Sequence, residues 1–541
     1  MRARSAGLMV VACVLWLIPL TAPMKGSAQD LEVVSEMTGI PLPQSYYDEL
    51  RRDPTAFQIQ HGWIARAEEA RQVGAAVEGT LPVLIIPILF SDSPEPWITP
   101  EEMEQNLFRG PADHGTLTGY YDEVSGGRLE VTGSVTPWIR TDVSLADAVS
   151  DNFGLGGNAE LGEVLWQALE AADTLVDFGA FDNDGPDGIP NSGDDDGFVD
   201  VVAFQFIEVA ASCGGPAPWP HRWRMAGWKG QSFESRATRP DGTPIRVNDY
   251  IIQSAVVCSG ESIQTPATIA HELGHILGLP DLYDSVEGLQ PEERRWVVGC
   301  WGIMAAGAWG CGDPTVRSET PMPPHMVPWS KEQLGWIDFV EVEPGIDREV
   351  TLDPVRESGQ ALRVPLSGSA HLHVEYRVQE GYDRDIPDSG VMIYHIDRNQ
   401  SVRRSGPDAP LLYRVMVLEA DGNESLLRNA MEGGNRGEPG DAWARESPGL
   451  LTNATHPSSR RHDESPSSAI LQDIRIEDGR AVLRVSTQAI PHTRLLRTLL
   501  GTSGNPLTDA ERLYLDRLGN RNGLFDLGDI RSYLRHQPTS R

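Results

Sequence analysis

Residues 271–281 read His-Glu-Leu-Gly-His-Ile-Leu-Gly-Leu-Pro-Asp, and this stretch decides how the surrounding chain must fold. His271 and His275 are four residues apart, so on a helix their side chains share one face and can reach a single metal ion. Glu272 lies beside them, where its carboxylate can hold a water molecule next to that ion. The stretch therefore predicts a metal-binding helix.

The chain that follows the helix supplies a further candidate ligand. Gly278 can leave the helix with a positive φ, and the resulting turn returns Asp281 toward the two histidines. Two imidazoles, one carboxylate and one open position are typical of a catalytic zinc site, whereas a structural site is closed by four protein ligands. We therefore predict a zinc site with Asp281 as its third ligand and Glu272 beside the activated water.

Neighbouring residues support the helix. Thr265-Pro266 has the pattern of an N-cap followed by proline at the first helical position. Apolar residues that recur at helical spacing give the segment a face to bury: Ile269, Leu273, Ile276 and Leu277. The alternative is that the two histidines are ordinary hydrogen-bonded side chains on an amphipathic helix.

The length of 541 residues predicts three or four domains behind an export signal. In residues 1–28, Arg2 and Arg4 supply positive charge, residues 8–20 are apolar, and residues 26–28 offer a small-residue cleavage site. The apolar part is too short to span a bilayer comfortably, and no later segment has about eighteen uninterrupted apolar residues. We expect a secreted, extracellular protein without a membrane span.

Cysteine usage fits export. Apart from Cys13 in the apolar segment, the chain has an even number of cysteines: Cys213, Cys258, Cys300 and Cys311. Four cysteines allow three pairings, and we favour Cys300–Cys311, a short loop near the metal helix, with Cys213–Cys258 as the other. Two zinc-thiolate ligands are the rival interpretation, although the chain has no Cys-x-x-Cys pair.

The formal net charge of −33 argues against nucleic acid as a partner, because phosphate binding needs clustered cations. Part of the acidity is concentrated in residues 181–200, FDNDGPDGIPNSGDDDGFVD. Carboxylates crowded into a tight loop repel one another unless a cation neutralises them, and hard oxygen ligands suit calcium. The candidate calcium ligands are Asp182, Asp184, Asp187, Asp194, Asp196 and Asp200. The alternative is a loop whose acidic side chains are merely solvated.

Three apolar segments predict a twisted sheet beside the metal helix: residues 81–90, 199–209 and 250–257. After Glu343 the pattern changes to short alternating strands punctuated by Gly, Pro and Asp, which predicts a β-rich region that ends near Thr487. The strands expected there are residues 348–352, 361–364, 371–377, 391–396 and 414–418.

The sequence resembles the immune inhibitor A family of secreted bacterial zinc metallopeptidases. The metal-binding stretch continues as Leu282-Tyr283-Asp284, as in that family's extended zinc signature. Further blocks match in the family's order: residues 120–133, the aspartate-rich loop, residues 219–223, the turn at Met304, residues 331–336, and residues 374–377, 381–383 and 390–395. The resemblance covers residues 80–487.

The resemblance implies an α+β fold with a metzincin-like zincin catalytic domain, a twisted mixed sheet plus an active-site helix. In that domain the zinc ligands would be His271, His275 and Asp281, with Glu272 as general base. Met304 would form the methionine turn that packs beneath the zinc without binding it. A β-rich, sandwich-like domain and a small helical module would follow.

The small helical module resembles a dockerin-type calcium repeat. Its candidate ligands are Asn520, Asn522, Asp526 and Asp529. The first loop position falls on Leu518, which cannot bind calcium through its side chain, and Asp516 lies two residues too early. Because so small a unit buries little surface, we expect it to need calcium or a surface or scaffold partner.

These patterns predict a division of the chain into six segments. They are a signal peptide (1–28), a candidate prosegment (29–80), a catalytic domain (81–345), a β-rich domain (346–487), a linker (488–506) and the dockerin-like module (507–541).

The sequence therefore predicts a secreted zinc endopeptidase that cleaves proteins or peptides and uses Zn²⁺ and Ca²⁺. We expect an exposed edge on the strand at residues 250–257 to hold the substrate extended, by β-strand addition. The first rival is a catalytically silent surface-binding protein on the same scaffold, which would not need all four zinc-site residues. The second is a zinc hydrolase of other bonds, such as esters or small amides.

Overall fold

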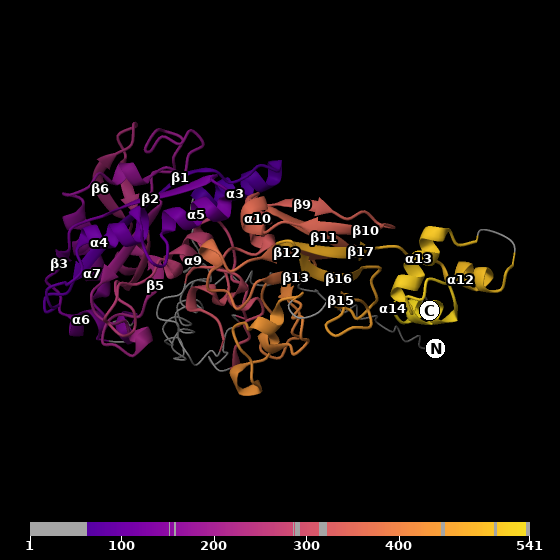
Figure 1. Cartoon of the computed structure of the whole chain (residues 1–541). Helices are drawn as coiled ribbons and strands as arrows, with labels where there is room; N and C mark the ends of the chain where they lie inside the picture. Colours follow the sequence, from indigo (N-terminus) through magenta and orange to yellow (C-terminus); the bar gives the residue numbers. More distant parts are fainter. Residues whose placement is uncertain are drawn as a thin grey trace, which may run out of the picture.

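A computed structural model shows a broad N-terminal half that narrows through two β-sheets to a helical C-terminus (Figure 1). The structure describes residues 62–150, 152–155, 158–284, 286, 293–312, 322–444, 449–502 and 506–536. The expected signal peptide and residues 29–61 of the expected prosegment lie outside these ranges. Within them, no helix is both long and apolar enough to cross a membrane.

The broad half is built on a mixed sheet with strand order β2-β1-β4-β8-β5, and β3 also pairs with β1. Its strands are β1 (Gly79–Leu89), β2 (Leu129–Val135), β3 (Ile139–Arg140), β4 (Val201–Phe206), β5 (His221–Arg224) and β8 (Asp249–Ser254). The pairings are parallel except for β5, which runs antiparallel to β8 at the edge. The three apolar segments singled out in the sequence thus form β1, β4 and β8, which lie side by side.

Helices cover both faces of this sheet, which explains why β1 is an unbroken apolar run. Leu81, Val83 and Ile85 enter one core, which α5 (Leu117–Ser125) and α9 (Ala267–Ile276) complete. Leu84, Ile86 and Ile88 enter the opposite core with α7 (Leu161–Ala172). Shorter elements of this half are α4 (Pro100–Glu104), α6 (Leu145–Val149), α8 (Met225–Lys229), α10 (Pro328–Leu334) and the ribbon β6 (Phe233–Thr238) with β7 (Pro244–Val247).

The end of the expected prosegment is part of this half. Helix α3 (Gly62–Val73) buries Trp63 completely, and the Trp63 Nε1–H donates to Asp200 Oδ2 at 3.0 Å. Gly62 approaches Asp184 so closely that a Cβ would have no room. Residues 62–80 are therefore packed into the broad half of the molecule.

The narrower half contains two further sheets, with strand orders β14-β13-β12-β11-β9 and β10-β17-β16-β15. The first contains β9 (Asp338–Glu341), β11 (Gln360–Ser367), β12 (Ala370–Arg377), β13 (Gly390–Asp397) and β14 (Val415–Val417). The second contains β10 (Asp347–Leu352), β15 (Gly449–Leu451), β16 (Ile470–Glu477) and β17 (Arg480–Ser486), and α11 (Val355–Ser358) connects the two sheets. Val350, Leu372 and Leu483 share one core between them, so this half is a two-sheet sandwich.

Strand β13 joins the two halves of the molecule. Its residues are all buried: Val391 and Ile393 enter the sandwich core, whereas Met392, Tyr394 and Ile396 enter the core that contains α9. Strand β9 begins at Asp338 and pairs with β11, so the sandwich starts before the expected boundary at residue 346. The two halves consequently share buried surface and are not independent domains joined by a linker.

The C-terminal helices dock against the sandwich. Helix α12 (His492–Leu499) lies in the segment expected to be a linker, and α13 (Asp509–Leu518) and α14 (Leu527–His536) follow it. Tyr514, Ile530 and Tyr533 pack with Ile470 of β16 and with Ile490. Two leucines of these helices are exposed: Leu513 by 54% and Leu527 by 65%. The linker expectation is therefore wrong for residues 492–499, because this helix contributes its own residue, Leu495, to the shared core.

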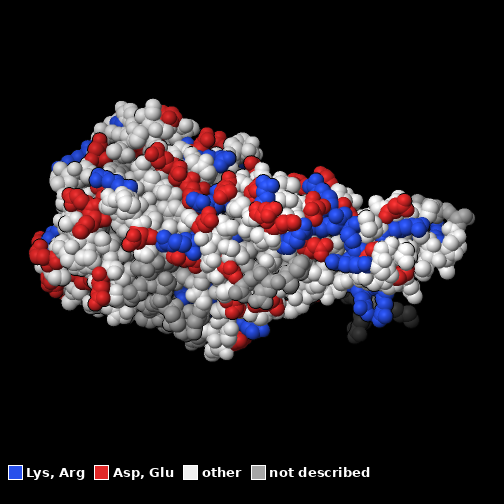
Figure 2. Space-filling view, viewed as in Figure 1, with Lys and Arg blue, Asp and Glu red and all other residues white. Residues whose placement is uncertain are grey.

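Charged side chains differ between the halves on the face drawn in Figure 2. Acidic groups are spread over the broad half, whereas basic groups gather over the sandwich among acidic neighbours. The pairs join strands of one sheet and the turns beside them: Arg484–Asp347 at 2.8 Å, Arg480–Asp353 at 2.6 Å and Arg475–Glu349 at 3.4 Å. Because these pairs are solvated, each contributes little to stability.

Candidate metal centre

The candidate metal ligands lie on α9, which is buried along its whole length. The helix begins at Ala267 with Pro266 as its N-cap, one residue later than the sequence pattern predicted. Gly274 faces Met304 so closely that a Cβ would collide with the methionine sulfur. Gly278 has a φ of 81° and releases the chain from the helix, as its position predicted.

The structure brings His271, His275 and Asp281 together. The Nε2 atoms of the two histidines are 3.1 Å apart, and Asp281 Oδ1 is 3.3 Å from His271 Nε2 and 3.2 Å from His275 Nε2. His271 and His275 are fully buried and Asp281 is 1% exposed. Three potential metal ligands from α9 and the following turn therefore converge on one point inside the protein.

The hydrogen bonds of the two imidazoles show what this point can accept. His271 Nδ1 is 2.7 Å from the carbonyl oxygen of Ile303, and His275 Nδ1 is 2.7 Å from that of Leu279. A carbonyl only accepts, so both Nδ1 atoms carry the proton and both Nε2 lone pairs face Asp281. Three electron-pair donors that face one another repel unless a cation lies between them. The donor set fits zinc, and the two carbonyls fix the imidazoles in the orientation that a metal needs.

Glu272 occupies the same helix turn and is 3% exposed. The hydroxyl of Tyr121 on α5 donates to the carbonyl of Ala270 at 2.6 Å, which fastens α5 to the helix one turn away. Burial raises the pKa of Tyr121 well above its usual value, and the negative charge of Glu272 raises it further. The phenol therefore stays neutral beside the carboxylate.

Two arginines at this centre carried no recognisable sequence signal. Arg403 Nη2 is 3.6 Å from Asp281 Oδ2, and Arg404 forms a buried pair with Asp284. Arg404 also donates to the backbone carbonyls of Pro407 and Ala409. Both arginines come from the loop between β13 and β14, far from α9 in the sequence, so only the tertiary fold places them here.

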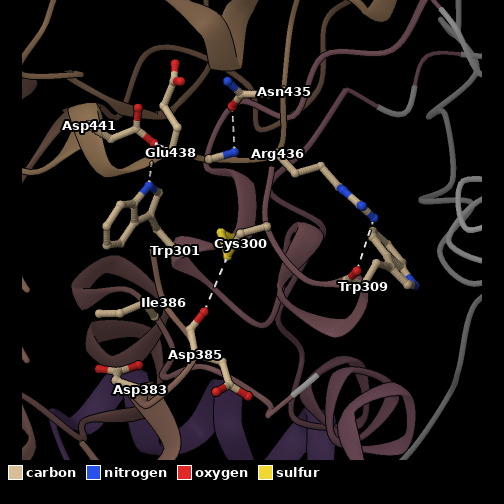
Figure 3. The surroundings of a disulfide bond; sticks show 12 residues. Cys300, Trp301, Trp309, Asp383, Asp385, Ile386, Asn435, Arg436, Glu438 and Asp441 are labelled. Carbon is tan, nitrogen blue, oxygen red and sulfur yellow. Dashed lines mark hydrogen bonds between the residues drawn. A yellow bond between two sulfur atoms is a disulfide. The ribbon is translucent and has the colours of Figure 1, made fainter. Parts of the chain in front are cut away.

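The segment that contains Met304 lies beneath α9 and is held in several ways. The Leu282 N–H donates to the Met304 carbonyl at 2.7 Å, which fastens the turn to the chain just after Asp281. A disulfide joins Cys300 to Cys311, with Trp301 and Trp309 on either side (Figure 3). The second disulfide joins Cys213 to Cys258, which follow β4 and β8.

The aspartate-rich loop divides into a buried and an exposed set. Asp182, Asp184 and Asp200 gather in the interior, where carboxylate oxygens from the three lie within 4.8 Å of one another. Of the other expected ligands, Asp187, Asp194 and Asp196 are exposed. Three of the six expected ligands therefore form a compact cluster, and α3 covers it.

Within the described residues, Asp182 is the member of this cluster whose carboxylate accepts the fewest hydrogen bonds. Both carboxylate oxygens of Asp182 are buried without a hydrogen-bond partner. Burial, with repulsion from Asp196, raises the pKa of Asp182 to about 8 and that of Asp184 to about 6. Burying ionised carboxylates in this way is costly unless a cation accompanies them, and their hard oxygen atoms fit calcium.

In the C-terminal loop the expected ligands bond mainly to the loop itself. Asp526 Oδ2 accepts from the amides of Asn520 and Asn522 at 3.1 and 3.0 Å, and Asp529 Oδ2 accepts from the Asp526 backbone N–H at 2.8 Å. Asp516, which lies outside the expected spacing, accepts from the Gly523 N–H at 3.1 Å. The loop therefore closes through hydrogen bonds within the described chain.

The expected substrate edge is on a different strand. Strand β8 pairs with β4 on one side and β5 on the other, so the prediction of an exposed edge at residues 250–257 is wrong. The edge is β5, whose residues 221–224 follow Trp219 and Pro220 in the sequence block. His221 is buried and bonds to the Trp219 carbonyl and the Tyr250 hydroxyl, so it packs inside the sheet.

Two inward-facing imidazoles and a glutamate on one buried helix, with a carboxylate from the turn that follows it, have the composition of a mononuclear metal centre of the hydrolase type. Residues 104–337 match the family described as the immune inhibitor A peptidase M6 catalytic domain, a range that contains the whole donor set. The resemblance noted in the sequence is therefore confirmed for residues 104–337, which are similar to this family's catalytic domain. The match ends just before β9, where the sandwich begins.

Two curated relatives share the same part of the chain. Immune inhibitor A of Bacillus thuringiensis subsp. alesti is 29% identical over 244 residues, which cover 42% of this chain and 34% of the relative. Pre-pro-metalloprotease PrtV of Vibrio cholerae serotype O1 is 29% identical over 210 residues, which cover 36% of this chain and 21% of the relative. The matches thus span about a third and about a fifth of the relatives' lengths.

Proposed function

We propose that this protein is a secreted zinc-dependent endopeptidase. The observation that carries the proposal is the pair of Nε2 lone pairs on His271 and His275, which face the Asp281 carboxylate in a buried site. The match of residues 104–337 to a peptidase catalytic-domain family supports hydrolysis of peptide bonds over that of other bonds. The name of the second relative, a metalloprotease, and that of the first, the protein for which the matched peptidase family is named, agree with an endopeptidase.

Each residue of the centre has a chemical task in this proposal. His271, His275 and Asp281 would hold zinc, which supplies Lewis acidity that polarises a carbonyl and lowers the pKa of a water. Glu272 would accept the proton that this water loses as its oxygen attacks the peptide carbon. Glu272 would then deliver the proton to the amide nitrogen when the C–N bond breaks. Arg403 would hold the Asp281 carboxylate in place through its charge.

The peptide substrate would lie extended along β5. A segment paired with this edge strand would use main-chain hydrogen bonds for affinity, which suits substrates of varied sequence. This mode of binding favours unfolded or flexible protein segments, because they can supply an unpaired strand.

Calcium would bind the buried cluster of Asp182, Asp184 and Asp200. The unpartnered oxygens of Asp182 support this assignment, and the Trp63 indole bonded to Asp200 ties α3 to the same cluster. Removal of a prosegment would therefore cut within residues 29–61 and leave α3 in place. The C-terminal helices would present their exposed face to a surface or scaffold partner, since their inner face is already docked on the sandwich.

The proposal is tested by incubating the purified protein with unfolded casein, with and without a zinc-selective chelator. We expect casein cleavage that the chelator stops and that added zinc restores. A protein that binds zinc but leaves casein intact at every concentration would instead support the silent binding protein. Cleavage of a small ester alone would support the hydrolase of other bonds.

A further inference from the structure

A second cluster of carboxylates lies in the sandwich half, apart from the two candidate metal sites described above. Glu419, Asp421 and Asp441 each offer an oxygen within 4.8 Å of the others. Glu419 and Asp421 follow β14, and Asp441 ends the short turn η11 (Pro439–Asp441). Glu419 is 3% exposed and Asp441 is fully buried, whereas Asp421 reaches the surface.

One carboxylate oxygen of Asp441 has no hydrogen-bond partner within the described residues. Its Oδ2 accepts from the Trp301 Nε1–H at 2.7 Å, the contact drawn in Figure 3, and from the Glu438 N–H at 3.0 Å. Its Oδ1 is buried without a hydrogen bond. A fully buried carboxylate with one oxygen held and the other unsatisfied is the arrangement that a bound cation would complete.

Among the described residues, no basic side chain is one of the strongest influences on this charge. Burial, followed by repulsion from Glu419, raises the pKa of Asp441 to about 8. Burial also raises the pKa of Glu419 to about 7, opposed chiefly by hydrogen bonds from Ser425 and Leu426. Among the described residues, the strongest influences on both pKa values are burial, hydrogen bonds and other carboxylates.

The backbone is shaped to bring the third carboxylate in. The Asp421 N–H donates to the Gly440 carbonyl at 3.1 Å, and the Ala420 N–H donates to the Asp441 carbonyl at 3.0 Å. Gly440 lies so close to the Asp421 carboxylate that a Cβ would collide with it. Backbone hydrogen bonds thus join residues 420–421 to residues 440–441, and the carboxylates of both segments lie close together.

A further group, formed by Glu332 of α10 with His371 and His373 of β12, shows the contrast. There Arg363 donates to Glu332 at 2.6 Å and lies 3.4 Å from His373 Nε2, so a guanidinium already supplies the positive charge. The acidic cluster at Asp441 has no such partner among the described residues that interact with it most strongly.

We infer that Glu419, Asp421 and Asp441 form a calcium site that ties the sandwich to the segment beneath the metal helix. Hard carboxylate oxygens from two irregular loops suit the flexible coordination of calcium better than the strict octahedron of magnesium. Trp301, bonded to Asp441, also accepts from Arg377 Nη1 through its carbonyl at 2.9 Å. Two residues later, Ile303 orients His271. The inference does not depend on peptidase activity.

The site is tested with terbium, a luminescent substitute for calcium that a neighbouring tryptophan excites. All proteins carry Glu272→Gln to prevent self-cleavage and Asp182→Asn to disable the aspartate-rich loop. We expect terbium luminescence that calcium displaces and that Trp301→Phe abolishes while bound calcium, measured by equilibrium titration, is retained. Trp97→Phe, at a tryptophan that is 53% exposed, is the control.

The ligand variant is Asp421→Asn, because Asp421 is exposed and its loss should not disturb folding. We expect it to weaken calcium binding by about tenfold or more and to remove the calcium-induced rise in Tm. The matched control, Asp408→Asn, changes an exposed aspartate in the same half. Equal calcium affinity and equal Tm response in Asp421→Asn and Asp408→Asn would overturn the site, as would the absence of any calcium binding in the parent protein. Asp441→Asn provides a second ligand variant, with the Tm in chelator as its measure of folding.

Discussion

The two candidate metal centres of the broad half hold their ligands in opposite ways. At the candidate zinc centre, backbone carbonyls accept hydrogen bonds from the Nδ1 atoms of His271 and His275, so the protein itself orients these two ligands. In the aspartate-rich loop, Asp182 has no hydrogen-bond partner at either carboxylate oxygen. The first centre has one buried carboxylate, Asp281, with Arg403 nearby, whereas the second has three buried carboxylates that repel one another unless a cation lies between them. The first centre should therefore survive metal loss, and the second should not.

This difference separates catalysis from stability. Loss of zinc should abolish turnover while the fold persists, because the carbonyls keep the imidazoles in place. Loss of calcium should weaken the fold around α3, because the uncompensated carboxylates repel one another. Each prediction below tests one side of this contrast.

The largest effect should follow His275→Ala. The variant lacks one of the three converging ligands, so it should lose zinc and casein cleavage together. Metal analysis of the purified protein and a casein assay measure both. The calcium-induced rise in Tm should remain, and its loss would show that the two centres are not independent.

Glu272→Gln should retain zinc because the ligands are unchanged, yet cleave casein about 10²- to 10⁴-fold more slowly. Glutamine cannot take the proton from the water. Single-turnover cleavage of a labelled peptide, alongside a zinc determination, measures the effect. Near-normal cleavage by a zinc-loaded variant would remove Glu272 from its proposed role.

Asp182→Asn should change the Tm in opposite directions in the absence and in the presence of calcium. In chelator the variant should melt at a higher temperature than the wild type, because it removes an unpartnered buried charge. In saturating calcium it should melt at a lower temperature, because a ligand is lost. Asp187→Asn, at an exposed aspartate of the same loop, is the matched control. If the variant has the higher Tm in both conditions, or the lower Tm in both, there is no calcium site at this cluster.

His221 offers a buried histidine without a metal role. Burial lowers its pKa to about 4, below an unfolded value of about 6.5. Its Nδ1–H donates to Trp219, so Nε2 must accept from Tyr250, and protonation would break that bond. The neutral ring stabilises the fold above about pH 6.5, and this contribution is lost as the pH falls toward about 4.

The free energy of unfolding, followed by denaturant melts across this pH window, measures the effect. His221→Gln should flatten the pH dependence, whereas His456→Gln, at a histidine whose side chain is 67% exposed, should leave it unchanged. Identical pH profiles for the wild type and His221→Gln would show that another group governs acid stability.

The smallest effect on activity should follow truncation after Leu500. Casein cleavage should stay within about twofold, because the removed helices contact the sandwich and not the zinc centre. The Tm should fall, since Ile470 and Ile490 lose their cover. A truncated enzyme with collapsed activity would make these helices part of the catalytic fold.

The sequence by itself determined the elements whose signals are local. The spacing of His271 and His275 places both on one face of a helix, and the apolar run of β1 requires cover on both faces. The alternating strands of the sandwich follow from a period that is visible within a few residues. Sequence order alone also placed Gly278 where a helix must end.

The tertiary structure decided which distant residues meet. Arg403 lies near Asp281, Trp63 bonds to Asp200 of the aspartate cluster, and Asp441 lies near Glu419, although no local sequence spacing predicts these contacts. Pairing also decided that β8 is an interior strand, that β9 joins the sandwich, and that α12 docks where a linker was expected. Strand partners and buried ion contacts are selected by packing across the whole chain, because an edge or a buried charge exists only once its neighbours are in place.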